Sequence, residues 1–156
     1  MSTHDLAAGR TGGIAALYVQ IARTLNRIPW DIIVIPMRLA IFIVFWRSGV
    51  VKLGDWSSTL FLFEDEYKLP ILPPALAAYM ATAVELGCSS LIFLGLGTRF
   101  AALVLLGMIL VIQTLVYPNA WADHLQWTAL ILPLLAYGAG RYSADGQIAR
   151  LTAPRT

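Results

Sequence analysis

Long apolar runs alternate with short polar connections along the chain. The first run, residues 32–53, is apolar apart from three cations, Arg38, Arg47 and Lys52. Because a helix that crosses a bilayer needs about 20 mostly apolar residues, this run predicts a membrane-spanning helix. Three later runs predict three more spans, over residues 71–94, 100–117 and 124–140. The expected fold is therefore an all-α membrane protein, an antiparallel bundle of four transmembrane helices.

The connections between the expected spans differ in composition. Residues 54–69 are too polar to cross a membrane, although their apolar centre, residues 59–63, is expected to dip into the interface. Prolines then open the second span, where the first-turn N–H groups have no helical partner. Residues 95–99 predict a tight hairpin between the second and third spans, and residues 117–123 predict a turn with interfacial aromatic side chains.

The segment before the first span shows a second kind of pattern. Residues 1–13 are small, polar and glycine-rich, so we expect them to lack fixed structure. Over residues 14–28, six apolar side chains fall at helical spacing, while Arg23 and Arg27 lie on the other side. This pattern favours an N-terminal amphipathic helix at the membrane interface, with packing on a soluble partner as the alternative. Pro29 is expected to end this helix.

Composition supports a membrane protein and excludes several site classes. The 156 residues are 58% hydrophobic and 13% charged, against roughly 45–50% and 25% in soluble domains. The single cysteine, Cys88, leaves no disulfide framework and is interpreted as a small buried apolar residue. We expect no intrinsic metal site, because no His, Cys or Met residues have ligand spacing, and no nucleic-acid surface. The N-terminus also lacks the pattern of a cleavable signal peptide.

The distribution of basic residues predicts the orientation in the membrane. Seven arginines fall on the side of the N-terminus: Arg10, Arg23, Arg27, Arg99, Arg141, Arg150 and Arg155. The opposite loops hold only Lys68 together with several acidic residues. The positive-inside rule then places both termini in the cytoplasm. The chain divides into a cytoplasmic tail with the amphipathic helix (residues 1–30), the bundle (31–140) and a cytoplasmic C-terminal tail (141–156).

The ionisable residues inside the expected spans are the candidate site. At a helical rise of about 1.5 Å per residue, Arg38 and Glu85 lie roughly 10 and 14 Å from the inner end, so we predict an ion pair between them. Lys52 shares the face of Arg38, whereas Arg47 points the opposite way and has no evident partner. The cluster of Arg38, Lys52 and Glu85 is either a packing device or a polar pocket for a small headgroup.

These residues also carry a resemblance to a known family. They form an ordered set that comprises Arg38, Gly49 and Lys52 in the first span, Glu85 in the second, Gly95, Thr98 and Arg99 in the hairpin, and Gly138, Gly140, Ser143 and Asp145 after the fourth. The set resembles the DoxX family of small bacterial four-helix membrane proteins over residues 37–145. The family's closing motif usually reads Gly-Pro-Gly before Ser-x-Asp, and here Ala139 replaces the proline.

The resemblance implies a role in membrane redox chemistry. Members resemble the small subunit of a thiosulfate:quinone oxidoreductase, partners of detoxifying redox enzymes, and membrane components of metal-handling peptide operons. We therefore expect a bacterial inner-membrane subunit of a redox or detoxification system that works with partner proteins. The sequence itself shows no redox centre, so we expect no intrinsic cofactor: the cofactor is either a lipid quinone, bound at Arg38, Lys52 and Glu85, or sits on the partner.

Two other functions stay open at this point. The protein is alternatively a non-catalytic anchor that recruits soluble enzymes through residues 14–28 or the acidic loop. The third hypothesis is a permease for small solutes or metal chelates. Because four spans enclose only a thin pathway, that hypothesis requires a homo-oligomer.

Overall fold

The structure is a computed structural model that describes residues 3–70 and 72–153, with side chains from residue 13 onward. The longer helices are α1 (Thr3–Leu25), α2 (Trp30–Gly54), α4 (Pro74–Leu94), α5 (Thr98–Val111) and α6 (Trp121–Tyr137). The shorter ones are α3 (Trp56–Phe61), α7 (Ala144–Thr152) and two π-helical segments, η1 (Leu62–Tyr67) and η2 (Ile112–Val116). This part of the chain contains no strand, so the expected all-α class is confirmed there.

Three helices in the described residues are long and apolar enough to cross a membrane. They are α2, α4, and α5 together with η2. The helix α6 has 17 residues, slightly fewer than the roughly 20 that a straight span needs. The molecule is thus a membrane protein with several apolar helices, and the fourth span of the expected bundle stays a prediction.

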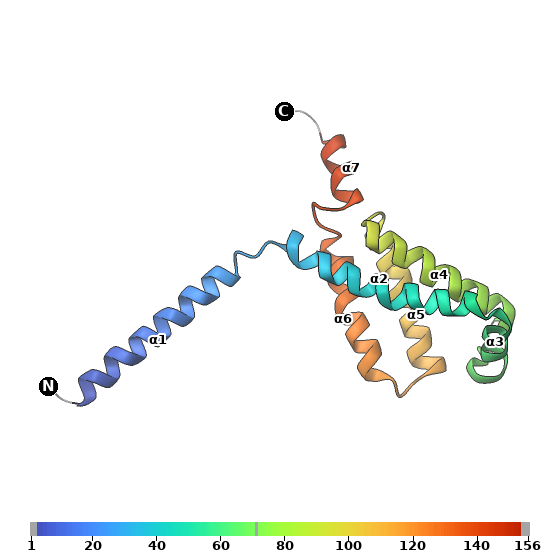
Figure 1. Cartoon of the computed structure of the whole chain (residues 1–156), viewed down its shortest axis with the longest axis horizontal. Coiled ribbons are helices and arrows are strands. Elements are labelled where there is room, and N and C mark those ends of the chain that lie inside the picture. The colour runs from blue at the N-terminus through green and yellow to red at the C-terminus, as the bar shows by residue number, and fades with distance from the viewer. Residues whose placement is uncertain (1–2, 71, 154–156) are drawn as a thin grey trace.

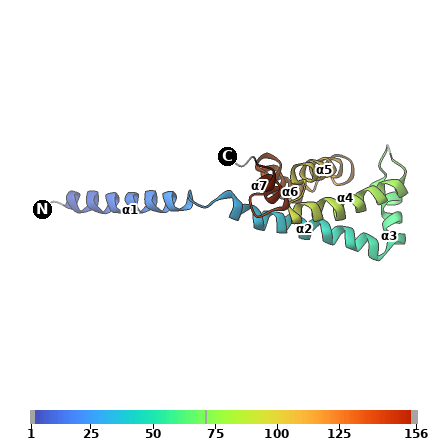
Figure 2. The same cartoon turned by 90° about the horizontal axis from the view of Figure 1, so that it is seen from above.

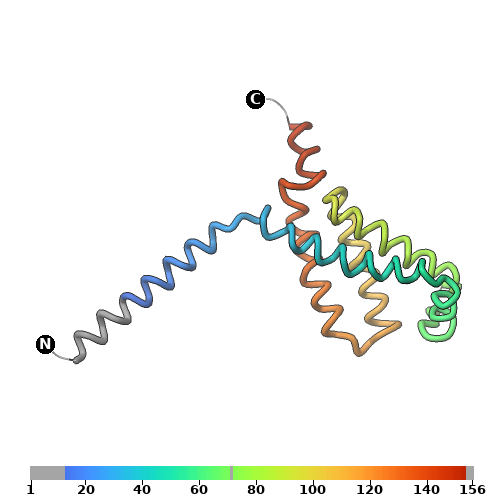
Figure 3. Tube along the Cα trace, viewed as in Figure 1, coloured from blue at the N-terminus to red at the C-terminus, as the bar shows by residue number. Residues whose placement is uncertain are grey.

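Two helical hairpins pack against each other. In Figure 1, α2 and α4 run side by side in opposite directions, and α5 and α6 form a second antiparallel pair that crosses them. The continuous trace in Figure 3 follows the same path. Gly49 lets α2 approach α4, because a Cβ there would lie 2.6 Å from the Leu86 Cγ. The core between the hairpins is aliphatic and includes Val34, Ile41, Ile92, Leu105, Ile131 and Leu134.

The helix ends follow the local sequence. Pro29 has extended backbone directly before α2, and Pro74 is the first residue of α4, where its missing N–H costs no hydrogen bond. Gly95 ends α4 at φ +68°, and the N–H of Leu96 reaches back to the carbonyl of Leu91 at 2.9 Å. This is the left-handed helix stop that glycine favours. It turns the chain sharply into α5.

The N-terminal segment differs from the expectation in one respect. Helix α1 begins at Thr3, so the prediction of an unstructured stretch up to residue 13 was wrong for its described part. The amphipathic helix is present, although it ends at Leu25 rather than at residue 28. Figures 1 and 2 show that α1 projects away from the hairpins. Its apolar side chains are accordingly uncovered, with Ile14 70% and Tyr18 71% exposed.

The loop after α2 folds back over the end of the first hairpin. The carboxylate of Asp55 caps α3 by accepting from the Ser58 N–H at 3.0 Å. Thr59 and Phe63 are buried on the hairpin, while Phe61 points outward and is largely exposed. The apolar centre of this loop, residues 59–63, is therefore partly a cover over the helices and partly an exposed apolar surface.

Candidate functional site

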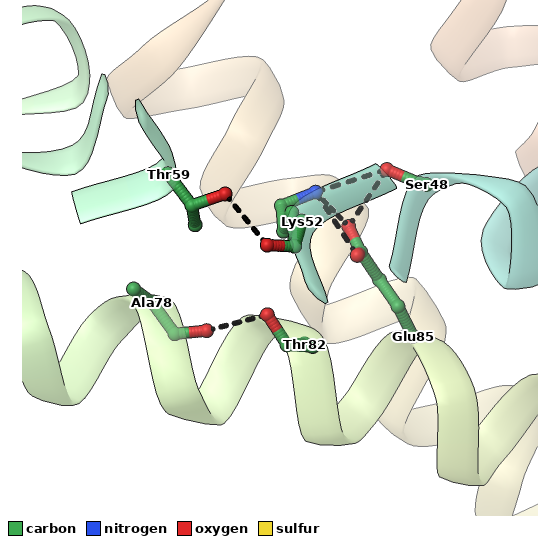
Figure 4. Close-up of polar contacts among 6 residues, drawn as sticks. All are labelled: Ser48, Lys52, Thr59, Ala78, Thr82 and Glu85. Atoms are coloured by element: carbon green, nitrogen blue, oxygen red, sulfur yellow. Dashed lines mark hydrogen bonds and ion pairs between the residues drawn. The ribbon is translucent and has the colours of Figure 1, made fainter. Parts of the chain in front are cut away.

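The most buried charge cluster joins α2 to α4. The Nζ atom of Lys52 lies 2.8 and 2.9 Å from the two carboxylate oxygens of Glu85. Ser48, one helical turn before Lys52, donates to Glu85 at 3.1 Å and accepts from Lys52 at 2.9 Å. Figure 4 shows the three side chains converging between the helices. We call Ser48, Lys52 and Glu85 the Lys52–Glu85 site.

The surroundings bury most of this site. The side chains of Lys52 and Glu85 are 13% and 4% exposed. Above them, the Thr59 hydroxyl donates to the Lys52 carbonyl at 3.0 Å, so α3 is fastened over the end of α2 (Figure 4). Thr82, one turn before Glu85 on α4, bonds its own helix at Ala78. A buried ion pair whose remaining oxygen lone pairs are also satisfied is the arrangement that tolerates such burial.

The predicted ion pair between Arg38 and Glu85 was wrong. The Arg38 guanidinium lies instead among main-chain carbonyls at the other end of the hairpin. Its Nε donates to the carbonyl of Ile92 at 2.9 Å, and Nη2 donates to that of Phe93. Nη1 donates to Ala139 at 3.3 Å and to Tyr142 at 3.0 Å. Arg38 therefore satisfies the last carbonyls of α4, where a cation also complements the helix dipole.

The register of the two helices explains the error. The prediction set the start of α2 level with the end of α4. In the structure, Trp30 and Val34 lie beyond the end of α4 and pack on residues 138–140. Arg38 consequently meets Ile92 rather than Glu85, a shift of seven residues, or roughly 10 Å along the helix. The same shift brings Glu85 level with Gly49 and within reach of the long side chain of Lys52.

Two glycines of the resemblance, Gly95 and Gly140, make close contacts at the first half of α2 and the segment after α6. A Cβ on Gly95 would meet Ser143 and lie 2.9 Å from the Arg38 Nη2. Gly140 has φ +77°, and a Cβ there would lie 2.9 Å from a methyl group of Val34. Ser143 caps α7 by accepting from the Gly146 N–H at 3.0 Å. These contacts lock the chain after α6 onto the ends of α2 and α4.

The remaining motif residues complete this junction. The Asp145 carboxylate accepts from the N–H groups of Gly97 at 2.8 Å and Thr98 at 3.0 Å, so it caps α5 from another helix. Arg99 donates to the carbonyl of Ala136 at 3.3 Å, and Gly138 accepts from the Trp30 indole at 3.2 Å. We call this set the Arg38 junction, consisting of Arg38, Gly95, Thr98, Arg99, Gly138, Gly140, Ser143 and Asp145. It is separated from Lys52 by fourteen residues of α2, about 21 Å.

A partly open cavity of about 170 Å³ lies beside the Lys52–Glu85 site. Ser48, Lys52 and Glu85 form one wall of this cavity. Apolar and aromatic side chains from α2, η1, α5 and α6 form most of the remainder, among them Phe45, Phe63, Met108, Val111 and Trp127. The cavity is therefore an apolar chamber with one charged, hydrogen-bonded wall.

Three polar side chains that sequence reasoning did not assign also line the cavity. Tyr67 comes from η1, Tyr117 follows η2, and His124 lies in the first turns of α6. The Tyr117 hydroxyl donates to Glu66 at 2.6 Å, and the His124 Nδ1 lies 2.5 Å from the Gln113 Oε1. Only the proximity of η1, η2 and α6 brings them together, so no spacing along the chain indicates their common site.

Both tyrosines are held as neutral phenols. Burial raises the pKa of Tyr67, because desolvation disfavours the phenolate. Burial also raises the pKa of Tyr117, and its hydrogen bond to Glu66 acts in the same direction. Tyr67 therefore remains a hydrogen-bond donor over the physiological pH range, whereas the O–H group of Tyr117 is already donated to Glu66.

Arg47 lies outside the cavity but next to it. An open groove of about 570 Å³ contains Arg47 together with Asp55 and Leu62. The groove and the cavity share three lining residues, Ser48, Lys52 and Tyr67, so these side chains separate the two hollows. Among residues 13–70 and 72–153, nothing forms a hydrogen bond or ion pair with the Arg47 guanidinium.

Of the four charged residues that the sequence analysis considered as a site, the structure joins Lys52 and Glu85. Arg38 belongs to the Arg38 junction, and Arg47 lies in the neighbouring groove. Cys88 is buried in the core between the hairpins. In the described part of the chain, no three His, Cys, Asp or Glu side chains are grouped as a metal site would require.

Comparison with known proteins identifies the family. The sequence profile of DoxX matches residues 33–118, which is more than half of the chain and contains the Lys52–Glu85 site. The match ends before α6, so the motif after that helix lies outside it. Neither the curated proteins nor the solved structures compared with the chain gave a match. The chain belongs to the DoxX family and is a membrane protein of the redox- or detoxification-associated type.

Proposed function

We propose that the protein is a membrane subunit of a redox or detoxification system and that its cavity holds the headgroup of a quinone. The observation that supports this proposal is a ring-sized apolar chamber with the buried Lys52–Glu85 site in its wall. Ionisable residues buried in membrane-spanning helices mark functional sites more often than not, because their burial is costly.

The size of the cavity agrees with a single ring. Its volume of about 170 Å³ is close to the roughly 150 Å³ of an engineered apolar cavity that binds benzene. Drug-sized and nucleotide ligands occupy sites of about 300–1,000 Å³ and would not fit. Phe45 and Trp127 offer flat apolar surfaces to a ring, and they are in edge-to-face contact at 5.6 Å.

The polar walls suit the oxygens of such a headgroup. The Tyr67 hydroxyl is the donor for a quinone carbonyl, because the Tyr117 hydroxyl donates to Glu66 and the three Lys52 N–H groups meet Ser48 and Glu85. A bound quinone would supply reversible two-electron, two-proton redox chemistry. Glu85 holds the Lys52 ammonium in place, while the bond from Tyr117 to Glu66 connects the cavity wall to the surface of the loop. We place the electron donor or acceptor on a partner protein.

We also propose a topology for this subunit. The junction around Arg38, with Arg99 and Arg141, lies at one end of the hairpins, while the acidic residues of η1 meet η2 at the other. With α6 as a fourth span, the positive-inside rule puts both termini in the cytoplasm of a bacterium and the Lys52–Glu85 site toward the outer face of the inner membrane.

A second candidate function is an anchor that recruits soluble enzymes. The observation in its favour is the uncovered apolar face of α1, which includes Ile14, Leu17 and Tyr18. Deletion of residues 3–25 separates the two candidates. Loss of co-purified proteins with unchanged quinone binding would assign recruitment to α1, and it would leave the cavity as an independent site.

The experiment that tests the proposal is native mass spectrometry of the protein extracted in mild detergent from its own membrane. We expect one quinone per chain in the wild type and at least a tenfold loss of occupancy in Glu85→Gln. The matched control is Ser90→Ala, which removes a hydroxyl from the same helix that bonds only the Leu86 carbonyl. Equal quinone occupancy in the two variants, or none in the wild type, would refute the proposal.

The permease hypothesis predicts a different result, which an uptake experiment would detect. Uptake of a small solute into proteoliposomes by the purified protein, with no bound quinone, would support transport through an oligomer instead of redox chemistry.

A further inference from the structure

A third hollow, far from the cavity, lies where the Arg38 junction meets α7. It is an open groove of about 770 Å³. Three arginines from separate parts of the chain line it: Arg99 at the start of α5, Arg141 after α6, and Arg150 in α7. Trp30 and Tyr137 form its apolar side, with ring centroids 5.4 Å apart. We call this hollow the arginine groove.

We propose that the arginine groove binds the phosphate group of an anionic phospholipid. This inference does not depend on the quinone proposal, because it concerns the opposite end of the molecule and other residues. It rests on the charge of the groove, on the donors that remain available there, and on the apolar surface beside it.

The charges that face the groove favour an anion. Two carboxylates also line it, but both are engaged with the protein. Asp145 accepts from the N–H groups of Gly97 and Thr98, and Asp31 accepts from the Arg141 N–H at 2.6 Å. The Arg141 guanidinium meets Asp31 through Nε alone, at 3.4 Å, and its side chain is 75% exposed.

The arginines retain most of their donors. Arg99 uses one Nη2 bond to Ala136, at 3.3 Å. Arg150 lies on the exposed surface of α7, and no hydrogen bond or ion pair within the described residues involves it. A guanidinium presents five N–H donors in a planar fork that matches two phosphate oxygens at once. The groove therefore offers donors that the protein itself does not satisfy.

The neighbouring surface suits acyl chains rather than water. Phe100, directly after Arg99 on α5, is 68% exposed, and Tyr137 at the end of α6 is 71% exposed. Helix α5 together with η2 is long enough to cross a membrane. Trp and Tyr side chains at such helix ends characteristically lie at the level of lipid headgroups. A phosphate in the groove would thus continue into chains along α5, and this continuity distinguishes a lipid from a free phosphate.

The test is native mass spectrometry in mild detergent with an equimolar mixture of phosphatidylglycerol and phosphatidylcholine. We expect phosphatidylglycerol adducts to predominate in the wild type. Arg150→Gln should reduce the preference about fivefold, the effect of one basic side chain beside an anionic headgroup. Arg99→Gln should reduce it by a similar factor. The control is Lys68→Gln, which removes one positive charge at the other end and should leave the preference unchanged.

Thermal unfolding without added lipid checks that each variant is folded, and Arg150 makes no contact whose loss would unfold the protein. Equal binding of the two lipids to the wild type would overturn the proposal, as would an unchanged preference in both arginine variants. If excess inorganic phosphate displaces phosphatidylglycerol and stabilises the protein against thermal unfolding as much as that lipid does, the groove binds free phosphate and the lipid assignment fails.

Discussion

The ion pair between Lys52 and Glu85 can be tested by replacing each charge with a neutral side chain of similar shape. Lys52→Met leaves the Glu85 carboxylate, 4% exposed, with only the Ser48 hydroxyl. Glu85→Gln leaves the Lys52 ammonium with the Ser48 hydroxyl, and the Lys52 side chain is 13% exposed. Breaking a buried pair from one side costs about 3–5 kcal/mol. Because Lys52 can reach solvent, we expect the loss in free energy of unfolding to lie below this range for Glu85→Gln and within it for Lys52→Met.

The double variant is the informative one. Lys52→Met combined with Glu85→Gln removes both charges and leaves no unpaired ion between the helices. We therefore expect its loss in free energy of unfolding to be smaller than the sum of the single losses by about 2 kcal/mol or more, the size of coupling found for direct contacts. Ser48 keeps a hydrogen-bond partner in the glutamine, so packing of α2 on α4 should survive.

The assay is unfolding of the purified protein in mild detergent by a denaturing detergent, followed by circular dichroism. A second cycle, Arg38→Gln with Glu85→Gln, is the control. Because Arg38 meets α4 at Ile92, seven residues and about 10 Å from Glu85, these two changes should add to within about 0.5 kcal/mol. Additive losses at Lys52 and Glu85, or strong coupling between Arg38 and Glu85, would refute the observed register.

Three further predictions concern packing, capping and pH. Gly49→Ala should lower the free energy of unfolding by about 1–3 kcal/mol through overpacking against Leu86; the same assay should show no loss for Gly87→Ala, where a Cβ meets nothing within 4 Å. Asp145→Ala should cost about 1–2 kcal/mol, because α5 loses its cap, and should accelerate hydrogen exchange at its first turn. Hydrogen bonds, first from the Ser58 side chain, lower the pKa of Asp55 to about 2. This depressed pKa stabilises the fold above the unfolded value of about 3.9, so the difference in Tm between wild type and Asp55→Ala should shrink as the pH falls from there through about 2.

The apolar helices could be predicted from the sequence because apolar runs, and the prolines and glycines that begin and end helices, are local properties. The apolar runs over residues 32–53, 71–94 and 100–117 predicted α2, α4 and the helix formed by α5 and η2 nearly to their ends. Gly95 marked the turn between α4 and α5. The start of α1 could not be predicted in this way. Small and glycine-rich residues make a weak helix signal, and the helix extends through them to Thr3.

The candidate site was predicted in part. Hydrophobic pattern singled out the buried charges, but the partner of Glu85 depends on how far α2 slides along α4. Neither helix carries that information alone, since Trp30 and Val34 fix the register by packing on the segment around Gly140. The cavity was missed for a related reason. Tyr67 and His124 belong to different elements, and only tertiary packing places them on one wall.

The most direct test of the account is photolabelling with a short-chain quinone that carries a photoreactive group on its ring, followed by peptide mapping. We expect the label on the cavity wall, at Tyr67, Tyr117 or Trp127, with protection by excess unlabelled quinone and loss of labelling in Glu85→Gln. Labelling confined to the lipid-facing surface, unaffected by competitor or by the Glu85 variant, would contradict a quinone site in this cavity.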